Sequence, residues 1–397
     1  MTRSDIVLVT YSTRPRGGVV HTLHLAEALH RLGESVHVVA IGDPEVGFFR
    51  PVEAPYTIIP APSPAPSLEA RVFRSLDALA DGLAALEQAF RILHAQDCIS
   101  ARAAARVRDL GAPAVVVRTV HHVDDFTTPA IVECQRQAIL EPDHLIVVSD
   151  HWRRALRQEY GVTAEVIHNG VDLERFTQEP ASGRAALRAR IGAENRFLFL
   201  TVGGIEPRKG SAELIEAMGE LRRTLAPPPV LAVVGGHSFQ DYGAYREDVL
   251  ARAESLGLEL GSDVVLLGTV ADEELPLWYR AADALAFPSR KEGWGLAVLE
   301  AMASGLPVVA TDIPVFREYL VAGRDALLVA PGDPAALADA MGTMTMDAEL
   351  RARLRVAGAR VAGRFPWEDT ARRHQLVYER LVQRWATRRP AYQPQHR

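Results

Sequence analysis

The chain has 397 residues, of which 48% are apolar and 24% are charged, and its formal net charge is −6. This length predicts two domains, the composition is typical of a soluble globular protein, and the acidic balance argues against a nucleic-acid-binding protein. Cys98 and Cys134, which form no C-x-x-C pair, exclude a disulfide framework or a zinc module and favour a cytoplasmic location. No apolar run approaches the roughly 18 residues that span a bilayer, and Ile6–Val9 is too short for the core of a signal peptide.

Short apolar runs alternate with longer amphipathic stretches along nearly the whole chain. The expected strands are Asp5–Thr10, Ser35–Ile41, Ala114–Val120, His144–Ser149, Glu165–His168, Arg196–Val202, Val230–Val234, Asp263–Leu267, Ala284–Phe287, Pro307–Ala310 and Ala326–Val329. The expected helices include Gly18–Leu32, Leu68–Leu93, Gly183–Arg190, Lys209–Leu225, Tyr242–Leu256, Leu296–Ala303 and Trp367–Arg388. Strands that are apolar on both faces and separated by helices predict the α/β class, with doubly wound, Rossmann-like parallel sheets.

The alternation restarts after a polar break at Val171–Glu194. We therefore predict an N-terminal domain at 1–175, a C-terminal domain at 176–374 and a hinge within the break, and we expect residues 375–397 to return to the first domain. The Pro-rich stretch Pro51–Pro66 is expected to be a surface loop. The last expected helix is rich in arginine and is interpreted as having a solvated face, because cations near a helix C-terminus suit its dipole. The alternative is that this basic helix makes a weak peripheral contact with a membrane surface.

The segment Pro288–Gly305, PSRKEGWGLAVLEAMASG, carries the strongest chemical signal. Glu292 and Glu300 stand on either side of a glycine turn that leads into a helix. Gly293 and Gly295 allow a backbone to approach a ligand closely, and the free N–H groups of the following helix suit a diphosphate. A carboxylate one turn into that helix, at Glu300, suits the paired hydroxyls of a ribose, and Glu292 suits sugar hydroxyls.

This segment resembles the E-x7-E region of the retaining glycosyltransferases of family 4. The resemblance implies the GT-B fold, in which two Rossmann-like domains face a cleft, an acceptor-side domain first and a donor-binding domain second. It implies that Glu292 is a catalytic residue at the donor sugar and that Glu300 binds the nucleotide ribose. The family usually has phenylalanine where Trp294 stands. The backbone between the two carboxylates is expected to contact the sugar and the phosphates, at Gly293, Trp294, Gly295 and Leu296.

Two segments of the first half resemble the family as well. Gly17 and Gly18 follow the first expected strand and match the family's glycine-rich first loop, where the backbone passes close to phosphate. His121 ends a buried strand and matches the family's histidine at the donor sugar, and ligands of open α/β sheets bind at such strand ends. We expect it to be the second catalytic residue. His21 and His24 lack a third ligand and are expected to be plain helix residues.

The segment VGGIEPRKG, residues 202–210, joins a strand to a helix and is expected to hold the diphosphate. The family has an arginine and then, five residues later, a lysine at this point. Lys209 matches the lysine, Gly204 stands at the arginine position, and Arg208 is the candidate for the second cation. The loops after two further strands are expected to line the donor pocket, at Gly236 and Val270.

The resemblance implies transfer of a sugar from a nucleotide-sugar, a UDP-sugar by family frequency, to an unknown acceptor with retention of configuration. The acceptor could be a small molecule, a lipid or a glycan, and the oligomeric state stays open. No D-x-D sequence is present, so neither a metal nor another cofactor is expected. The alternatives are a nucleotide-sugar epimerase on the same fold, a non-catalytic sugar-binding protein, and a nicotinamide-dependent dehydrogenase. A dehydrogenase is disfavoured because its G-x-G-x-x-G fingerprint does not follow any of the expected strands of this sequence.

Overall fold

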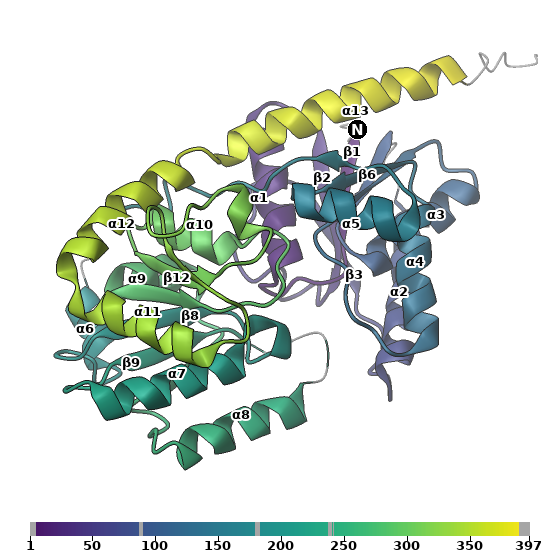
Figure 1. Ribbon diagram of the computed structural model, residues 1–397. Helices are drawn as coiled ribbons and strands as arrows, with labels where there is room; N and C mark the ends of the chain where they lie inside the picture. The colour runs from purple at the N-terminus through teal and green to yellow at the C-terminus, as the bar shows by residue number, and fades with distance from the viewer. Residues whose placement is uncertain (1–4, 87–89, 179–182, 237–239, 241, 389–397) are drawn as a thin grey trace, which may run out of the picture. The chain divides into compact units, whose positions relative to one another are not determined.

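The computed structural model describes residues 5–86, 90–178, 183–236, 240 and 242–388. The chain divides into two compact units (Figure 1). Unit 1 is the chain up to Gly170 together with the chain from Trp367 onward, and unit 2 is Val171–Pro366. The boundaries expected from the sequence, after residue 175 and before residue 375, lie a few residues further along the chain.

Unit 1 is built on a parallel sheet with the strand order β3-β2-β1-β4-β5-β6-β7 within its described residues. The strands are β1 (Ile6–Thr10), β2 (Val36–Gly42), β3 (Tyr56–Pro60), β4 (Ile92–Ala95), β5 (Val115–Val120), β6 (His144–Val147) and β7 (Glu165–Val166). The helices around this sheet are α1 (Gly17–Arg31), α2 (Leu68–Ala84), α3 (Cys98–Asp109), α4 (Pro129–Leu140), α5 (Asp150–Tyr160) and α13 (Trp367–Arg388).

Unit 2 repeats this plan with the strand order β10-β9-β8-β11-β12-β13 in the part of the chain described. The strands are β8 (Leu198–Val202), β9 (Val230–Val234), β10 (Val264–Gly268), β11 (Ala284–Phe287), β12 (Val308–Thr311) and β13 (Leu327–Val329). The helices are α6 (Arg184–Ala189), α7 (Ser211–Thr224), α8 (Gly243–Ser255), α9 (Leu275–Ala281), α10 (Leu296–Ala303), α11 (Pro334–Met346) and α12 (Ala348–Ala362). The predicted class, α/β with two doubly wound parallel sheets, is confirmed.

The structure corrects the sequence-based prediction at two strands of unit 1. The expected surface loop Pro51–Pro66 contains β3, which pairs with β2 alone, and Pro60 is tolerated there because an edge strand leaves one side unpaired. The expected helix Leu68–Leu93 was too long, because α2 ends at Ala84 and β4 begins at Ile92. Four buried residues carry too little periodicity to be told from a helix, and only the pairing of β4 with β1 and β5 defines them as a strand.

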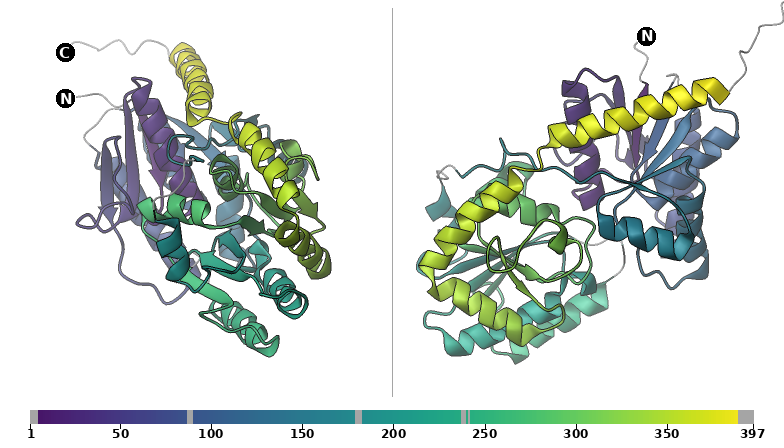
Figure 2. Two further views of the ribbon diagram at one scale, coloured as in Figure 1. Left: turned by 90° about the vertical axis from the view of Figure 1, so that its left-hand side faces the viewer. Right: turned by 45° about the horizontal axis from the view of Figure 1, so that its top comes forward.

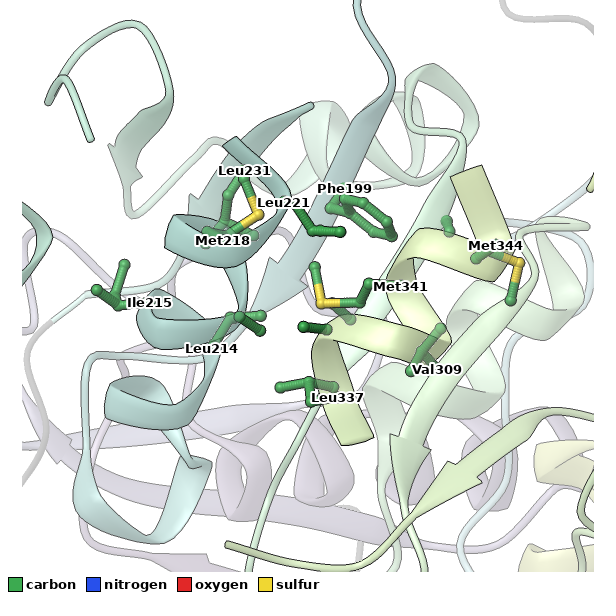
Figure 3. Close-up of a cluster of buried hydrophobic side chains, with 14 of the residues drawn as sticks. Phe199, Leu214, Ile215, Met218, Leu221, Leu231, Val309, Leu337, Met341 and Met344 are labelled. Atoms are coloured by element: carbon green, nitrogen blue, oxygen red, sulfur yellow. The ribbon is translucent and has the colours of Figure 1, made fainter. Parts of the chain in front are cut away.

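The core of unit 2 shows why its helices cover the sheet. Leu214, Met218 and Leu221 recur along one face of α7 and are buried against β8 and β9. Figure 3 shows Met341 and Leu337 of α11 pointing toward Leu214 of α7. Because a fully buried aliphatic side chain contributes about 1.5–3 kcal/mol, this cluster is a main source of the unit's stability.

The last helix, α13, begins at Trp367, as the sequence predicts, and packs against α1 (Figures 1 and 2). Its buried face includes Trp367, Ala371, His374 and Tyr378, which recur at helical spacing. None of the helices in the described ranges is apolar over enough length to cross a membrane.

Each sheet has one point where the strand order reverses, which is where doubly wound proteins bind ligands. In unit 1 this point lies between β1 and β4, and in unit 2 it lies between β8 and β11. Because all strands of a sheet run parallel, the loops that leave their carboxyl ends gather at one edge.

Candidate functional site

In unit 2, the loops after β8 and β11 meet beside the switch point of the sheet. The Arg290 backbone N–H donates to the Arg208 carbonyl oxygen at 2.8 Å. Gly210 has φ +66°, and a Cβ atom there would lie 2.1 Å from the Pro288 carbonyl oxygen. A glycine is therefore required where the two loops pass each other.

These loops bring together Glu292 and the two neighbouring cations, Arg208 and Lys209. The Lys209 ammonium lies 2.6 Å from Glu292 Oε1, and Arg208 Nη1 lies 3.6 Å from the same oxygen. Arg208 also pairs with Glu206, whose Oε2 is 2.9 Å from the arginine Nε. Both side chains therefore reach one carboxylate, although they belong to successive residues.

Burial perturbs the ionisation of this cluster. Desolvation lowers the pKa of Lys209, although Glu292 favours the charged ammonium. Burial by itself would raise the pKa of Glu292, but Lys209 and Arg208 outweigh it and hold the pKa below its usual value. Glu292 is thus an ionised, nearly buried carboxylate, and the cluster carries one more positive than negative charge when Glu206 is not counted.

The packing around Gly204 disfavours a side chain at that position. A Cβ atom at Gly204 would lie 2.7 Å from the Gly236 carbonyl oxygen. A Cβ at Gly235, which has φ +151°, would lie 2.5 Å from the Gly203 backbone. The loops after β8 and β9 are thus in backbone contact, and a long side chain at position 204 would force them apart.

The turn before α10 presents an uncapped helix N-terminus at the same edge of the sheet. Gly295 precedes the helix with φ +89°, and no side chain caps the N–H groups that begin at Leu296. Trp294 points its ring away from this turn and is buried against Tyr319, with the ring centroids 4.7 Å apart. Gly293 separates this buried ring from Glu292. The Tyr319 hydroxyl donates to the Trp294 carbonyl oxygen at 2.9 Å and fixes the backbone of the turn.

The second carboxylate, Glu300, is buried inside the same helix. The Tyr279 hydroxyl of α9 donates to Glu300 Oε2 at 2.7 Å. Burial raises the pKa of Glu300, which the tyrosine and the nearby Arg175 only partly oppose. The sequence analysis missed Tyr279, and its sequence distance from Glu300 leaves no local pattern that would have revealed it.

The other two donor-binding candidates lie in the loops after β9 and β10. Gly236 follows β9, and a Cβ atom there would lie 2.4 Å from the Thr269 hydroxyl oxygen. Val270 lies next to Thr269 and is half-buried. The structure therefore brings these two loops together at the carboxyl edge of the sheet, where Gly236 leaves room for the Thr269 hydroxyl.

In unit 1, Gly18 and His121 come together at the switch point of the sheet. A Cβ atom at Gly18 would lie 3.8 Å from His121 Cδ2, while Gly17 is exposed and has no such neighbour within 4 Å. His121 Nε2 lies 3.3 Å from the side-chain oxygen of Gln96, which the sequence analysis missed. Gln96 directly follows β4, and predicting that strand would have identified it. Burial lowers the pKa of His121 to about 3.

His21 and His24 are helix residues of α1, as predicted. His21 Nδ1 is hydrogen-bonded to the Asn169 side-chain oxygen at 2.9 Å, and His24 stacks on Trp367 with ring centroids 5.4 Å apart. Over the described ranges, no group of three or more His, Cys, Asp or Glu side chains is arranged as a metal site.

Each of the two units matches a known protein family. The family described as "Glycosyltransferase Family 4" matches residues 15–175, and the family described as "Glycosyl transferases group 1" matches residues 184–361. The phosphatidyl-myo-inositol mannosyltransferase of Mycobacterium leprae is 31% identical over 394 residues, which cover 95% of this chain and 96% of that relative. The D-inositol 3-phosphate glycosyltransferase of Streptomyces avermitilis is 36% identical over 63% of this chain, and the match spans 54% of the relative's length.

Among solved structures, Anabaena Alr3699/HepE in complex with UDP and glucose has a TM-score of 0.78 with 22% identity. The likeness covers 94% of this chain and 99% of that one, and at this identity it shows a shared fold. Because the two family matches together span most of the sequence and one relative matches over nearly its whole length, the chain belongs to glycosyltransferase family 4.

Proposed function

We propose that this protein transfers a hexose from a UDP-sugar to an acceptor hydroxyl, with retention at the anomeric carbon and without a metal ion. The observation that carries the proposal is the cluster of buried Glu292 with the half-buried Lys209 and Arg208, beside the uncapped start of α10. This arrangement suits a sugar diphosphate, whose charge grows as the bond to the sugar breaks.

The leaving diphosphate is the group that the site must stabilise. Lys209 and Arg208 supply two positive charges, and the N-terminus of α10 supplies a positive dipole end and free N–H groups. Glu292 keeps the ammonium in place and offers its carboxylate to sugar hydroxyls. Cations fixed before the reaction need no reorganisation during it, so a divalent ion is not required in this scheme.

Glu300 and His121 bind the ribose and the transferred sugar of the donor in this proposal. Glu300, oriented by Tyr279, accepts hydrogen bonds from the ribose hydroxyls. His121 is neutral at physiological pH and contacts the transferred sugar from unit 1. The acceptor hydroxyl attacks from the face that the diphosphate leaves, and the departing phosphate takes its proton.

A UDP-sugar is favoured as donor because the HepE structure of similar fold is described in complex with UDP and glucose. Both relatives are named for inositol-containing acceptors, so a panel of acceptors should begin with myo-inositol, inositol phosphates and phosphatidylinositol.

A thermal-shift screen tests the proposal on the intact chain. UDP or one UDP-sugar should raise the melting temperature, and EDTA should leave the shift unchanged, because a ligand stabilises the folded state that it binds. Glu300→Ala should weaken the shift, whereas Glu349→Ala, on α12 in the same unit, should not. The proposal would be refuted if no nucleoside diphosphate and no nucleotide-sugar raised the melting temperature of the protein. A shift that EDTA removes would refute the metal-independent form, and an isomerised sugar without released diphosphate would indicate the epimerase.

A further inference from the structure

Gln96 is a buried polar residue beside His121 whose role the sequence context does not explain. It directly follows β4, one of the two strands that flank the switch point of unit 1. Its backbone N–H donates to the Val9 carbonyl oxygen at 3.0 Å, and Ser100 Oγ lies 3.2 Å from the same nitrogen. The residue is therefore held at the strand end, and only 3% of its surface is exposed.

The side-chain oxygen of Gln96 faces one nitrogen of the His121 ring. The Gln96 Oε1 atom lies 3.3 Å from His121 Nε2. A carboxamide oxygen only accepts hydrogen bonds, so this contact is a hydrogen bond when the imidazole donates from Nε2. Because burial keeps the ring neutral, Nδ1 is then unprotonated and is left as a hydrogen-bond acceptor.

A second histidine holds the ring from another side. The edge of the His21 ring lies against His121, with the centroids 4.6 Å apart and the planes 74° apart. His21 is itself fixed by Asn169, through the 2.9 Å contact of its Nδ1. The His121 ring is thus contacted from two sides, by Gln96 and by His21.

The amide nitrogen of Gln96 adds an independent observation. Gln96 Nε2 is buried and has no hydrogen-bond partner within the described residues. Leaving such a donor unpaired is unfavourable, so a site that keeps one beside its expected catalytic residue is suited to a ligand oxygen. A carbohydrate offers hydroxyl oxygens of this kind.

We propose that Gln96 is a positioning and binding residue that holds His121 as the Nε2–H tautomer and donates its own amide N–H to a hydroxyl of the sugar bound there. This inference rests on the proposed role of His121 in sugar transfer. The carboxamide oxygen sets the histidine, and the carboxamide nitrogen recognises the ligand.

Nuclear magnetic resonance of the full chain tests the tautomer without any substrate. In protein labelled with ¹⁵N-histidine, His121 is assigned by the signals that His121→Asn removes. We expect a neutral ring protonated on Nε2 between pH 6 and 8. A ring protonated on Nδ1, or an equal mixture of the two tautomers, would overturn the proposal.

Two substitutions separate the oxygen of Gln96 from its nitrogen. Gln96→Glu keeps an acceptor and loses the donor, so the Nε2–H tautomer should persist and the pKa of His121 should rise. Gln96→Leu loses both groups, so the tautomer preference should disappear. The charged and titratable groups around the ring, which stay constant in both variants, are His21, Arg118, His122 and His374. An unchanged tautomer in Gln96→Leu would contradict the proposal.

Kinetics with the donor identified by the thermal-shift screen test the amide N–H. Loss of one neutral hydrogen bond predicts a decrease of about tenfold in kcat/KM for Gln96→Glu. Gln158→Glu, an exposed change of the same charge on α5, should retain the wild-type value. An unchanged kcat/KM in Gln96→Glu, at a melting temperature that shows a folded protein, would overturn the binding role.

The two levels of the hypothesis fail in different ways. If His121→Ala transfers sugar at the wild-type rate, the proposed role of His121 is wrong even where the tautomer is found as expected. If His121→Ala is inactive while the wild-type ring is protonated on Nδ1, the proposed function stands and the role of Gln96 is wrong.

Discussion

At the scale of single residues, the choice of lysine at position 209 is informative. The chain has 44 lysines and arginines, and only Lys209 and Lys291 are lysines. The Lys209 ammonium lies 4.7 Å above the centre of the Phe287 ring, and its Cε lies 3.2 Å from the point where Gly203 would carry a Cβ atom. The space between a ring and a glycine suits a compact ammonium better than a planar guanidinium.

Lys209→Arg should therefore lower the transferase activity although it keeps the positive charge. We expect kcat/KM to decrease by about 10- to 100-fold, because the larger head group displaces Glu292 and the oxygen atoms of the donor. Lys291→Arg is the matched control and should keep near wild-type kinetics. Wild-type activity in Lys209→Arg would show that charge alone is required at this position.

Tyr279→Phe should reveal the ionisation of Glu300. The tyrosine hydroxyl lowers the pKa of Glu300 against the larger effect of burial, which raises it. Without the hydroxyl this pKa should rise further, so the carboxylate should become protonated, and nucleotide affinity should decline, at a higher pH than in the wild type. Calorimetric titration with UDP from pH 5 to pH 8 measures the displacement. Coincident pH profiles of UDP affinity for the two proteins would contradict this account.

At the scale of elements, the start of α10 depends on one glycine. Gly295 has φ +89°, and a Cβ atom there would lie 2.5 Å from the Phe316 ring. Gly295→Ala should cost at least about 2 kcal/mol of unfolding free energy, from backbone strain and overpacking together. It should also weaken UDP binding, because the N–H groups of the first turn move. Urea denaturation checks the stability, and Gly342→Ala, where a Cβ atom would lie 3.5 Å from Leu221, provides the control.

The helix α13 makes unit 1 sensitive to acid. Burial lowers the pKa of His374 to about 4, and it lowers the pKa values of His21 and His94 well below the usual range. In the unfolded chain a histidine titrates near 6.5, so the unfolded state binds more protons from about pH 6.5 down to about pH 4. Each of these histidines should therefore remove about 1–2 kcal/mol of stability as the pH falls from 7 to 5.

His374→Gln tests this explanation. The variant should be less stable at pH 7, yet its unfolding free energy should depend less steeply on pH between 7 and 5, because one buried titrating group is gone. Chemical denaturation at several pH values measures the slope. His30→Gln, at an exposed position on α1, should leave the wild-type slope unchanged.

At the scale of the whole molecule, the chain passes twice between its units, and each unit contains a close contact at these passages. In unit 2, the Val171 backbone N–H donates to the Phe365 carbonyl oxygen at 2.7 Å. In unit 1, a Cβ atom at Gly170 would lie 2.7 Å from the Trp367 backbone. The two passing segments therefore stay side by side, which explains how α13 returns to unit 1 after the whole of unit 2.

Gly170→Ala should accordingly destabilise unit 1 by about 1–3 kcal/mol or more, because backbone atoms yield less easily than a side-chain tip. Hydrogen exchange followed by mass spectrometry should show faster exchange in α13 and α1 than in α7 and α11. Equal acceleration in both units would contradict the assignment of α13 to unit 1.

The sequence by itself determined the features that are written locally. Apolar runs predicted the parallel strands. Glu292, Lys209 and the glycine turn each follow one of these strands, and the structure brings them together because the strands of the sheet run one way. The sequence also predicted α13 from Trp367 to Arg388, because helical periodicity extends over many residues there.

Only the tertiary structure decided the features that depend on neighbours distant in the chain. The segment β4 is a strand because it pairs with β1 and β5. The segment β3 is a strand because it pairs with β2. Tyr279 meets Glu300 through the packing of α9, and Gln96 meets His121 because adjacent strands end together. A run of four buried residues, a lone tyrosine or a lone glutamine carries no periodic signal, so their roles arise from the free energy of contacts that a linear pattern does not contain.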